Sequence, residues 1–206
     1  MPWPTKTLDT IVVRSLLRLR WRRSRGWLVL LALFAITALC TLAAQSGADR
    51  GQPPGGARLV AVEGLVRPLF VLPSLSGPVQ ELGRFHSKVV LVHFFATWCE
   101  PCRDEMASLE QLQSRLDGRP FAIVSVSVAE SKDAVRRFFQ GDPPPFAILL
   151  DHDRSVARAW NIQTLPSTNV LDLALKPRLM AEGDVDWGQP DVMNMLMQLF
   201  VEASPG

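Results

Sequence analysis

Two cysteines separated by two residues are the part of this chain best suited to chemistry. Cys99 and Cys102 stand in the run Trp98-Cys99-Glu100-Pro101-Cys102, directly after an apolar stretch and at the expected start of a helix. The free N–H groups and partial positive charge of a helix N-terminus favour a thiolate over a thiol. We therefore expect a redox-active disulfide, in which Cys99 is the attacking sulfur and Cys102 resolves the mixed disulfide.

A zinc site and a permanent structural disulfide are the other uses of such a pair. Zinc in proteins usually has four ligands. The third cysteine, Cys40, lies in an apolar segment, and the three histidines show no ligand-like spacing. The sequence therefore predicts no metal site. A permanent disulfide remains an alternative for the two cysteines taken alone, and the residues around them favour the redox interpretation.

The segments that must position the cysteines alternate between strand and helix patterns. Expected strands cover 89–95, 121–128, 146–150, 167–171 and 179–183, and expected helices cover 99–116, 132–140, 155–160 and 191–202. The first of these strands is a continuous apolar run, which is typical of a strand buried on both faces. The first helix carries an apolar stripe at helical spacing, formed by Cys102, Met106, Leu109, Leu112 and Leu116. This alternation predicts an α/β domain.

The same segments resemble the TlpA/ResA-like branch of the thioredoxin superfamily. The similarity is strongest over Lys88–Glu110 (KVVLVHFFATWCEPCRDEMASLE), and it continues through residues 155–171 and begins near Pro68. In all it extends over about residues 66–202. The resemblance implies a thioredoxin-like fold with an opening hairpin and a central mixed sheet flanked by helices. It also implies a membrane-tethered bacterial thiol–disulfide oxidoreductase.

The resemblance assigns roles to residues outside the cysteine pair. Pro166 is similar to the family's cis-proline, which would expose the backbone of Leu165 to an extended substrate segment beside the two cysteines. Without the resemblance, an ordinary trans turn proline would be the expectation. Glu105 lies one helical turn after Cys102 and matches a glutamate that the family often has there. A partly buried carboxylate could exchange protons with Cys102. An exposed glutamate in the first turn would instead only stabilise the helix through its interaction with the helix dipole.

His93 is a departure from the family pattern. It stands where thioredoxins carry a buried aspartate and where many relatives of this branch carry asparagine. Strand alternation places it on one face with Val89 and Leu91. A neutral imidazole there could accept a proton and a protonated one could favour thiolates, but a core histidine without chemistry is an equal alternative. Trp98, Glu100 and Pro101 complete the expected supporting residues of the active site.

Charge and hydropathy separate an N-terminal anchor from the folded domain. Residues 1–25 carry seven Lys or Arg and one Asp, a net charge of +6, whereas the whole chain has a net charge of +2. We expect residues 1–26 to be a basic cytoplasmic segment and the 18 uncharged residues 27–44 to be a transmembrane helix. Residues 45–65 are expected as a linker and 66–206 as the thioredoxin-like domain. Cleavage near Ser46-Gly47-Ala48 is the alternative to an uncleaved anchor.

These features predict a single-pass protein of the bacterial inner membrane with its C-terminal domain in the periplasm. By resemblance, it would reduce disulfides of substrate proteins, for example in cytochrome c maturation or at metal-site cysteines, and draw electrons from a membrane thiol donor. A thiol-based copper-binding chaperone of thioredoxin fold is the alternative, although that class generally has three residues between its cysteines. We expect no cofactor beyond the Cys99–Cys102 disulfide. No nucleic-acid partner is expected, because the basic excess is confined to the N-terminal segment.

Overall fold

The computed structural model describes residues 56–201, which form a six-stranded sheet and a small hairpin. The sheet has the strand order β1-β8-β7-β4-β5-β6. Its strands are β1 (Val60–Ala61), β4 (Val89–Phe95), β5 (Phe121–Val128), β6 (Ala147–Asp151), β7 (Ser167–Leu171) and β8 (Pro177–Glu182). β4, β5 and β6 are parallel, whereas β7 is antiparallel to both β4 and β8. The predicted mixed sheet is therefore confirmed.

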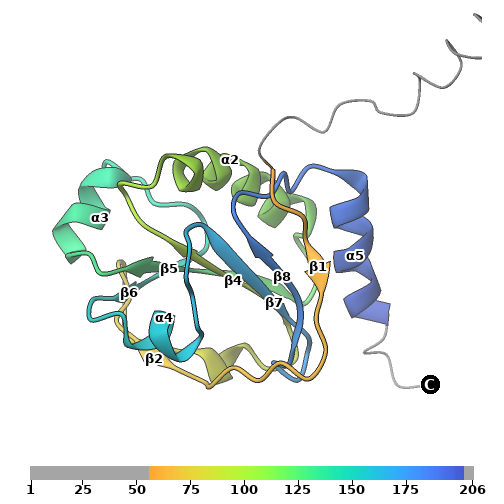
Figure 1. The fold of residues 1–206 in the computed structure, drawn as a ribbon. Coiled ribbons are helices and arrows are strands. Elements are labelled where there is room, and N and C mark those ends of the chain that lie inside the picture. The colour runs from red at the N-terminus through yellow and green to blue at the C-terminus, as the bar shows by residue number, and fades with distance from the viewer. Residues whose placement is uncertain (1–55, 202–206) are drawn as a thin grey trace, which may run out of the picture. The chain divides into compact units, whose positions relative to one another are not determined.

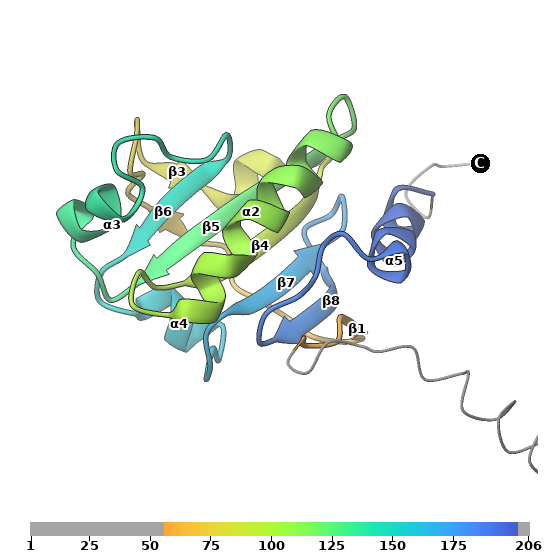
Figure 2. The ribbon, with the colours of Figure 1, turned by 90° about the horizontal axis from the view of Figure 1, so that it is seen from above.

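Helices cover both faces of this sheet (Figure 1). The helices are α2 (Glu100–Arg115), α3 (Lys132–Phe138), α4 (Ser155–Ala159), α5 (Pro190–Val201) and the 3₁₀ helix η1 (Leu82–Phe85). α2, α3 and α5 contribute to one hydrophobic cluster, while α4, η1 and the hairpin strand β2 (Val71–Leu72) contribute to the other. The second hairpin strand is β3 (Gln80–Glu81). Figure 1 shows the sheet between these two layers, and Figure 2, seen from above, shows α2 lying across β4 and β5.

The central strand β4 is buried along its whole length, as its apolar run predicts. Leu91 and Phe95 pack in the cluster with α2, and Val92 and Phe94 pack in the opposite cluster. This alternation places His93 on the α2 face, together with Leu91. The apolar stripe of α2 packs on that face, so its predicted role in the core is confirmed.

Most elements lie within a few residues of their predicted bounds, and the expected opening hairpin is present as β2 and β3. One strand was not predicted. β1 pairs antiparallel with β8 through Val60 and Met180, so part of the range 45–65 that we expected as a linker belongs to the sheet. A two-residue strand gives too short a pattern to be seen in the sequence. β8 also begins two residues earlier than expected, at Pro177.

The expected membrane span lies outside the residues that the structure describes. Between residues 56 and 201, none of the helices has the length and apolar character needed to cross a bilayer. The segments 1–26 and 27–44 both precede this range.

Candidate active site

Cys99 and Cys102 form a disulfide where α2 begins, with a Cα–Cα distance of 5.3 Å. Cys99 is the N-cap residue of α2, and its Sγ accepts a hydrogen bond of 3.3 Å from the backbone N–H of Cys102. Pro101 stands in the first turn, where a missing N–H costs the helix no hydrogen bond. Cys99 is 5% exposed and Cys102 is 0% exposed. A second sulfur-containing molecule would therefore meet Cys99 first.

The residues beside Cys99 differ sharply in exposure. Trp98 is 75% exposed, which is unusual for so large an apolar side chain. Glu100, on the other side of Cys99, is also exposed. Cys99 is thus flanked in the chain by an exposed apolar residue and an exposed acidic residue.

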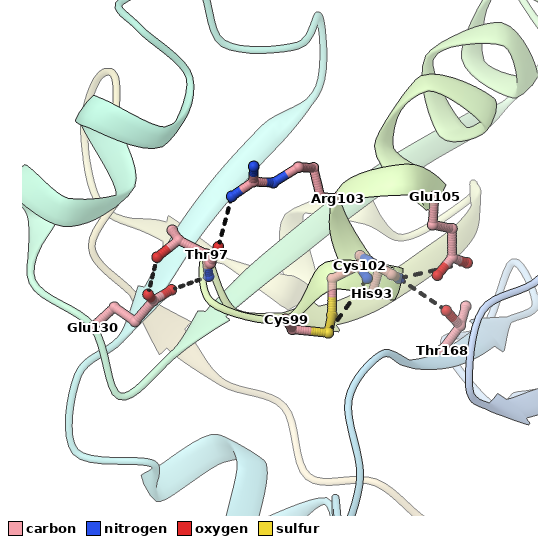
Figure 3. The surroundings of a disulfide bond; sticks show 8 residues. All are labelled: His93, Thr97, Cys99, Cys102, Arg103, Glu105, Glu130 and Thr168. Carbon is pink, nitrogen blue, oxygen red and sulfur yellow. Dashed lines mark hydrogen bonds and ion pairs between the residues drawn. A yellow bond between two sulfur atoms is a disulfide. The ribbon is translucent and has the colours of Figure 1, made fainter.

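The loop before Cys99 is fastened by Glu130, a residue that the sequence analysis did not single out. The carboxylate of Glu130 accepts hydrogen bonds from the backbone N–H and hydroxyl of Thr97 and from the hydroxyl of Ser127. Arg103 donates from the other side to the carbonyl oxygen of Thr97, at 3.4 Å (Figure 3). Thr97 and Glu130 are 33 residues apart in the chain. No local sequence pattern joins them.

The peptide bond between Leu165 and Pro166 is cis. β7 begins at the next residue, Ser167, which pairs with Phe94 near the end of β4. The chain that leaves β4 leads to Cys99 within a few residues, so this pairing brings the cis-proline loop to the end of the sheet that carries the disulfide. The cis bond and the position of the loop both agree with what the resemblance implied for Pro166 and Leu165.

Behind the disulfide lies a buried polar cluster formed by His93, Glu105, Thr168 and Trp187. Nδ1 of His93 is 3.0 Å from the hydroxyl of Thr168 and 4.0 Å from Oε1 of Glu105. The indole N–H of Trp187 donates to the same Oε1 at 2.6 Å. Figure 3 shows His93 between Glu105 and Thr168, with Cys102 beside it. The structure thus brings both predicted proton-active residues to the inner side of Cys102.

Burial keeps both titratable groups of this cluster neutral near pH 7. Desolvation raises the pKa of Glu105 to about 8, against smaller opposing effects from the Trp187 hydrogen bond and the backbone of Val185. Desolvation lowers the pKa of His93 to about 3. The 4.0 Å contact is therefore between an uncharged imidazole and a protonated carboxyl group rather than an ion pair. The interpretation of Glu105 as an exposed first-turn residue is wrong, since its side chain is buried.

Thr168 and Trp187 are further site residues that sequence reasoning missed. Thr168 lies directly opposite His93 in the β4–β7 register, and its place could have been found by aligning the two predicted strands. Trp187 lies in the connection between β8 and α5, 82 residues from Glu105. No sequence signal indicates that contact. Between residues 56 and 201, no group of three or more His, Cys, Asp or Glu side chains could hold a metal ion.

Comparison with known proteins agrees with this geometry. A model of the AhpC/TSA family matches residues 64–176 of the chain. The chain is 36% identical to the thiol-disulfide oxidoreductase ResA of Bacillus subtilis over 110 residues, which cover 53% of this chain and 62% of ResA. It is 37% identical to the thioredoxin-like protein YneN of the same organism over 113 residues, covering 53% and 65% of the two chains. The matched part is therefore less than two thirds of the length of either relative.

Solved structures show the same fold at lower sequence identity. A putative thiol:disulfide interchange protein DsbE from Chlorobium tepidum superimposes with a TM-score of 0.59 at 24% identity, covering 70% of this chain and 99% of that one. A putative thioredoxin from Neisseria meningitidis gives a TM-score of 0.60 at 21% identity, covering 67% and 91%. The described residues therefore have the predicted thioredoxin-like fold.

Proposed function

Because the chain belongs to the AhpC/TSA family, we propose that it is a thiol–disulfide oxidoreductase that reduces substrate proteins through Cys99 and Cys102. One observation carries the proposal. A disulfide closes the N-terminus of α2, with Cys99 slightly exposed (5%), Cys102 fully buried and a cis-proline loop brought to the same end of the sheet. The names of the relatives ResA and DsbE support the same activity.

The reaction consists of two exchanges of sulfur–sulfur bonds. The Cys99 thiolate of the reduced protein attacks one sulfur of a substrate disulfide, which breaks that bond, forms a mixed disulfide and releases one substrate thiolate. Cys102 then loses its proton and attacks the Cys99 sulfur. This second step releases the other substrate thiolate and leaves the Cys99–Cys102 disulfide, so that two electrons have passed to the substrate. A dithiol donor must reduce the protein again before the next cycle.

Glu105 supplies the route for the proton of Cys102. The cysteine is fully buried, so its proton has no direct access to water. The ionised form of Glu105 can accept this proton, and with a pKa of about 8 roughly one carboxyl in ten is ionised at pH 7. A base whose pKa lies close to the working pH is well matched to a thiol. His93 lies 4.0 Å from Oε1 of Glu105, and its pKa of about 3 makes it a much weaker proton acceptor than Glu105.

We further propose that the protein reduces rather than forms disulfides and that residues 27–44 anchor it in the bacterial inner membrane, with the active site in the periplasm. The reductive direction is supported by the resemblance of Glu100-Pro101 to reductive members of the family. The location is supported by the uncharged segment behind a strongly basic flank. Cytochrome c maturation and the reduction of metal-site cysteines are the processes that the resemblance favours, with a membrane thiol protein as electron donor.

Reduction of a protein disulfide by the purified chain, with dithiothreitol as donor, tests the activity. Wild type should accelerate insulin reduction, Cys99→Ser should abolish the acceleration, and Cys102→Ser should accumulate a mixed disulfide with the substrate because the first exchange survives. If limiting iodoacetamide modifies Cys102 before Cys99, the assigned roles are wrong. Equal activity of wild type and Cys99→Ser would reject the function itself.

Two further measurements separate this proposal from its alternatives. Equilibration with glutathione buffers should give a reduction potential nearer the roughly −270 mV of thioredoxin than the roughly −120 mV of a strong periplasmic oxidant. A value above about −180 mV would favour disulfide formation or isomerisation instead. Titration of the reduced chain with Cu(I) tests the copper-binding alternative, which requires tight stoichiometric binding.

A further inference from the structure

We propose that a groove beside Cys99 selects substrate segments that carry an apolar side chain and an acidic residue next to the reacting cysteine. The inference rests on the proposed function and names the class of substrate that the same site accepts. Four features of the groove carry it. These are its size and position, its apolar lining, the unpaired backbone groups of Leu165, and the single charged residue among those that line it.

The groove lies at the carboxyl ends of three parallel strands. Trp98 follows β4, Ala129 follows β5 and Arg154 follows β6, and all three line it together with the loop that ends at Leu165. Figure 2 shows α4 and the start of α2 at this same end of the sheet. Ligands of open α/β sheets bind at such carboxyl ends. The volume of about 190 Å³ is smaller than the 300–1,000 Å³ of ordinary small-molecule sites, and it suits one side chain of a protein segment.

The lining of the groove is largely apolar. Val128, Ala157 and Ile162 are buried residues that contribute to it, and the strongly exposed Trp98 also lines it. Aromatic side chains in such positions are the usual anchors of protein–protein contacts. Trp98 is the neighbour of Cys99 in the chain, so an apolar residue bound here would lie close to the substrate cysteine under attack.

The groove also offers unpaired backbone groups. Among the described residues, no backbone hydrogen bond involves the N–H or C=O of Leu165, whereas the next carbonyl, of Pro166, accepts from Gly183 at 2.8 Å. An extended segment can pair with such free groups as an added strand would. This pairing is independent of the side chains of the substrate, so selectivity must come from the side chains that line the groove.

Arg154 is the one charged residue among those that line the groove. Within residues 56–201, no hydrogen bond or ion pair involves its guanidinium group, unlike those of Arg103 and Arg158, which donate to carbonyl oxygens. Its backbone lies in the left-handed region, with φ of 62°, and backbone hydrogen bonds to Asp151 and from Arg158 hold that turn. Such conformations are costly for residues other than glycine and are often found at functional sites.

A free guanidinium group beside an apolar groove favours a carboxylate and disfavours a lysine or arginine. Neither Glu100 nor any other acidic residue is among the described residues that line the groove. Substrates with an aspartate or glutamate near the cysteine should therefore react faster than substrates with a basic residue at the same place.

Three peptide disulfides test this selectivity. They carry the same leucine on one side of the cysteine and differ only in aspartate, asparagine or lysine on the other side. With the reduced full-length chain, kcat/KM should fall from the aspartate to the asparagine to the lysine peptide, by about fivefold at each step for a partly desolvated charge pair. The differences should shrink strongly in 0.5 M NaCl because salt screens exposed charges.

Charge variants identify the residue responsible. Arg154→Glu should reverse the order of the three peptides, and Arg154→Asn, whose side chain tolerates the left-handed backbone, should make them nearly equal. Arg158→Glu makes the same change in net charge within α4, but Arg158 does not line the groove. This variant should therefore keep the wild-type order of the peptides. The inference is overturned if Arg154→Glu leaves the order of the three peptides unchanged, or if Arg158→Glu changes that order to the same extent as Arg154→Glu. Failure of wild type to reduce even the asparagine peptide would instead reject the proposed function.

Discussion

Glu105 and His93 show how burial sets the chemistry of single residues. Their side chains are 4.0 Å apart and fully buried, and at neutral pH each holds the uncharged form that burial favours. Near pH 7 most of the Glu105 carboxyl groups therefore carry a proton, and only the ionised fraction can accept the proton that the buried thiol of Cys102 must lose. The apparent pKa values of such a cluster belong to the group of residues rather than to one of them.

Replacement of Glu105 by glutamine should slow the resolving step. The amide cannot accept the proton of Cys102, so we expect the rate of mixed-disulfide resolution to fall about 100-fold and to lose its pH dependence near 8. Stopped-flow measurement of resolution between pH 6 and 9 checks this.

Trp187→Phe is the matched control for that variant. It keeps the aromatic ring but removes the N–H donor that stabilises the ionised carboxylate, so the pKa of Glu105 should rise and the inflection of the profile should move to higher pH. If the pH profiles of the resolution rate of both variants superimpose on that of wild type, Glu105 has only a structural role.

The same two groups predict how stability depends on pH. His93 binds a proton only in the unfolded state between about pH 3 and 6.5, so it makes stability rise with pH in that window. Glu105 holds a proton only in the folded state between about pH 4.5 and 8, so it makes stability fall as pH rises there. The two contributions cancel between about 4.5 and 6.5.

The pair should therefore contribute a plateau of stability between about pH 4.5 and 6.5, with a fall on either side. Compared with wild type, Glu105→Gln should lose the fall above pH 6.5, and His93→Asn should lose the fall below 4.5. Urea unfolding of the full chain from pH 3.5 to 8.5 measures both. If the difference in unfolding free energy between each variant and wild type does not change with pH, the protonation of the two groups is not linked to folding.

At the scale of elements, a single residue between β5 and α3 fixes the loop between β4 and α2. Glu130 accepts from Thr97 and Ser127, and its backbone carbonyl accepts from Nδ1 of His152. These hydrogen bonds join the segments that follow β4, β5 and β6. Because Trp98 and Cys99 follow Thr97 directly, the position of the attacking sulfur depends on these hydrogen bonds.

Glu130→Ala should free the loop that leads to Cys99. Loss of the charge-assisted hydrogen bonds should lower the free energy of unfolding by about 2 kcal/mol, speed hydrogen exchange of the Thr97 amide and lower kcat/KM for disulfide reduction. Asp133→Asn removes an exposed carboxylate three residues along the chain and should leave all three quantities near wild type. If the two variants behave alike, Glu130 does not position the loop.

The elements themselves could be read from the sequence because their signals are local. The apolar run of β4 and the stripe of α2 both act within a few residues. The contacts of Glu130 with Thr97 and of Trp187 with Glu105 could not be read, since they join residues 33 and 82 positions apart through side-chain packing. The resemblance supplied Pro166, but no sequence pattern marked Arg154 or the groove that it lines.

At the scale of the whole molecule, the described domain carries the reacting sulfur and the groove at one end of its sheet. The segments 1–26 and 27–44, which we propose as a cytoplasmic segment and a membrane span, precede the described residues in the chain.

The full-length chain should remain in the membrane with its N-terminus intact. The 18 uncharged residues behind a flank of +6 favour an uncleaved span with the domain outside the cytoplasm. In bacterial cells that express it, the chain should resist alkaline carbonate extraction, and a membrane-impermeant maleimide should label reduced Cys99 in intact spheroplasts. Cys99→Ser, which keeps the buried Cys102, controls for labelling at other thiols. A mature N-terminus near Asp49 by mass spectrometry would reject the anchor, and labelling only after lysis would reject the orientation.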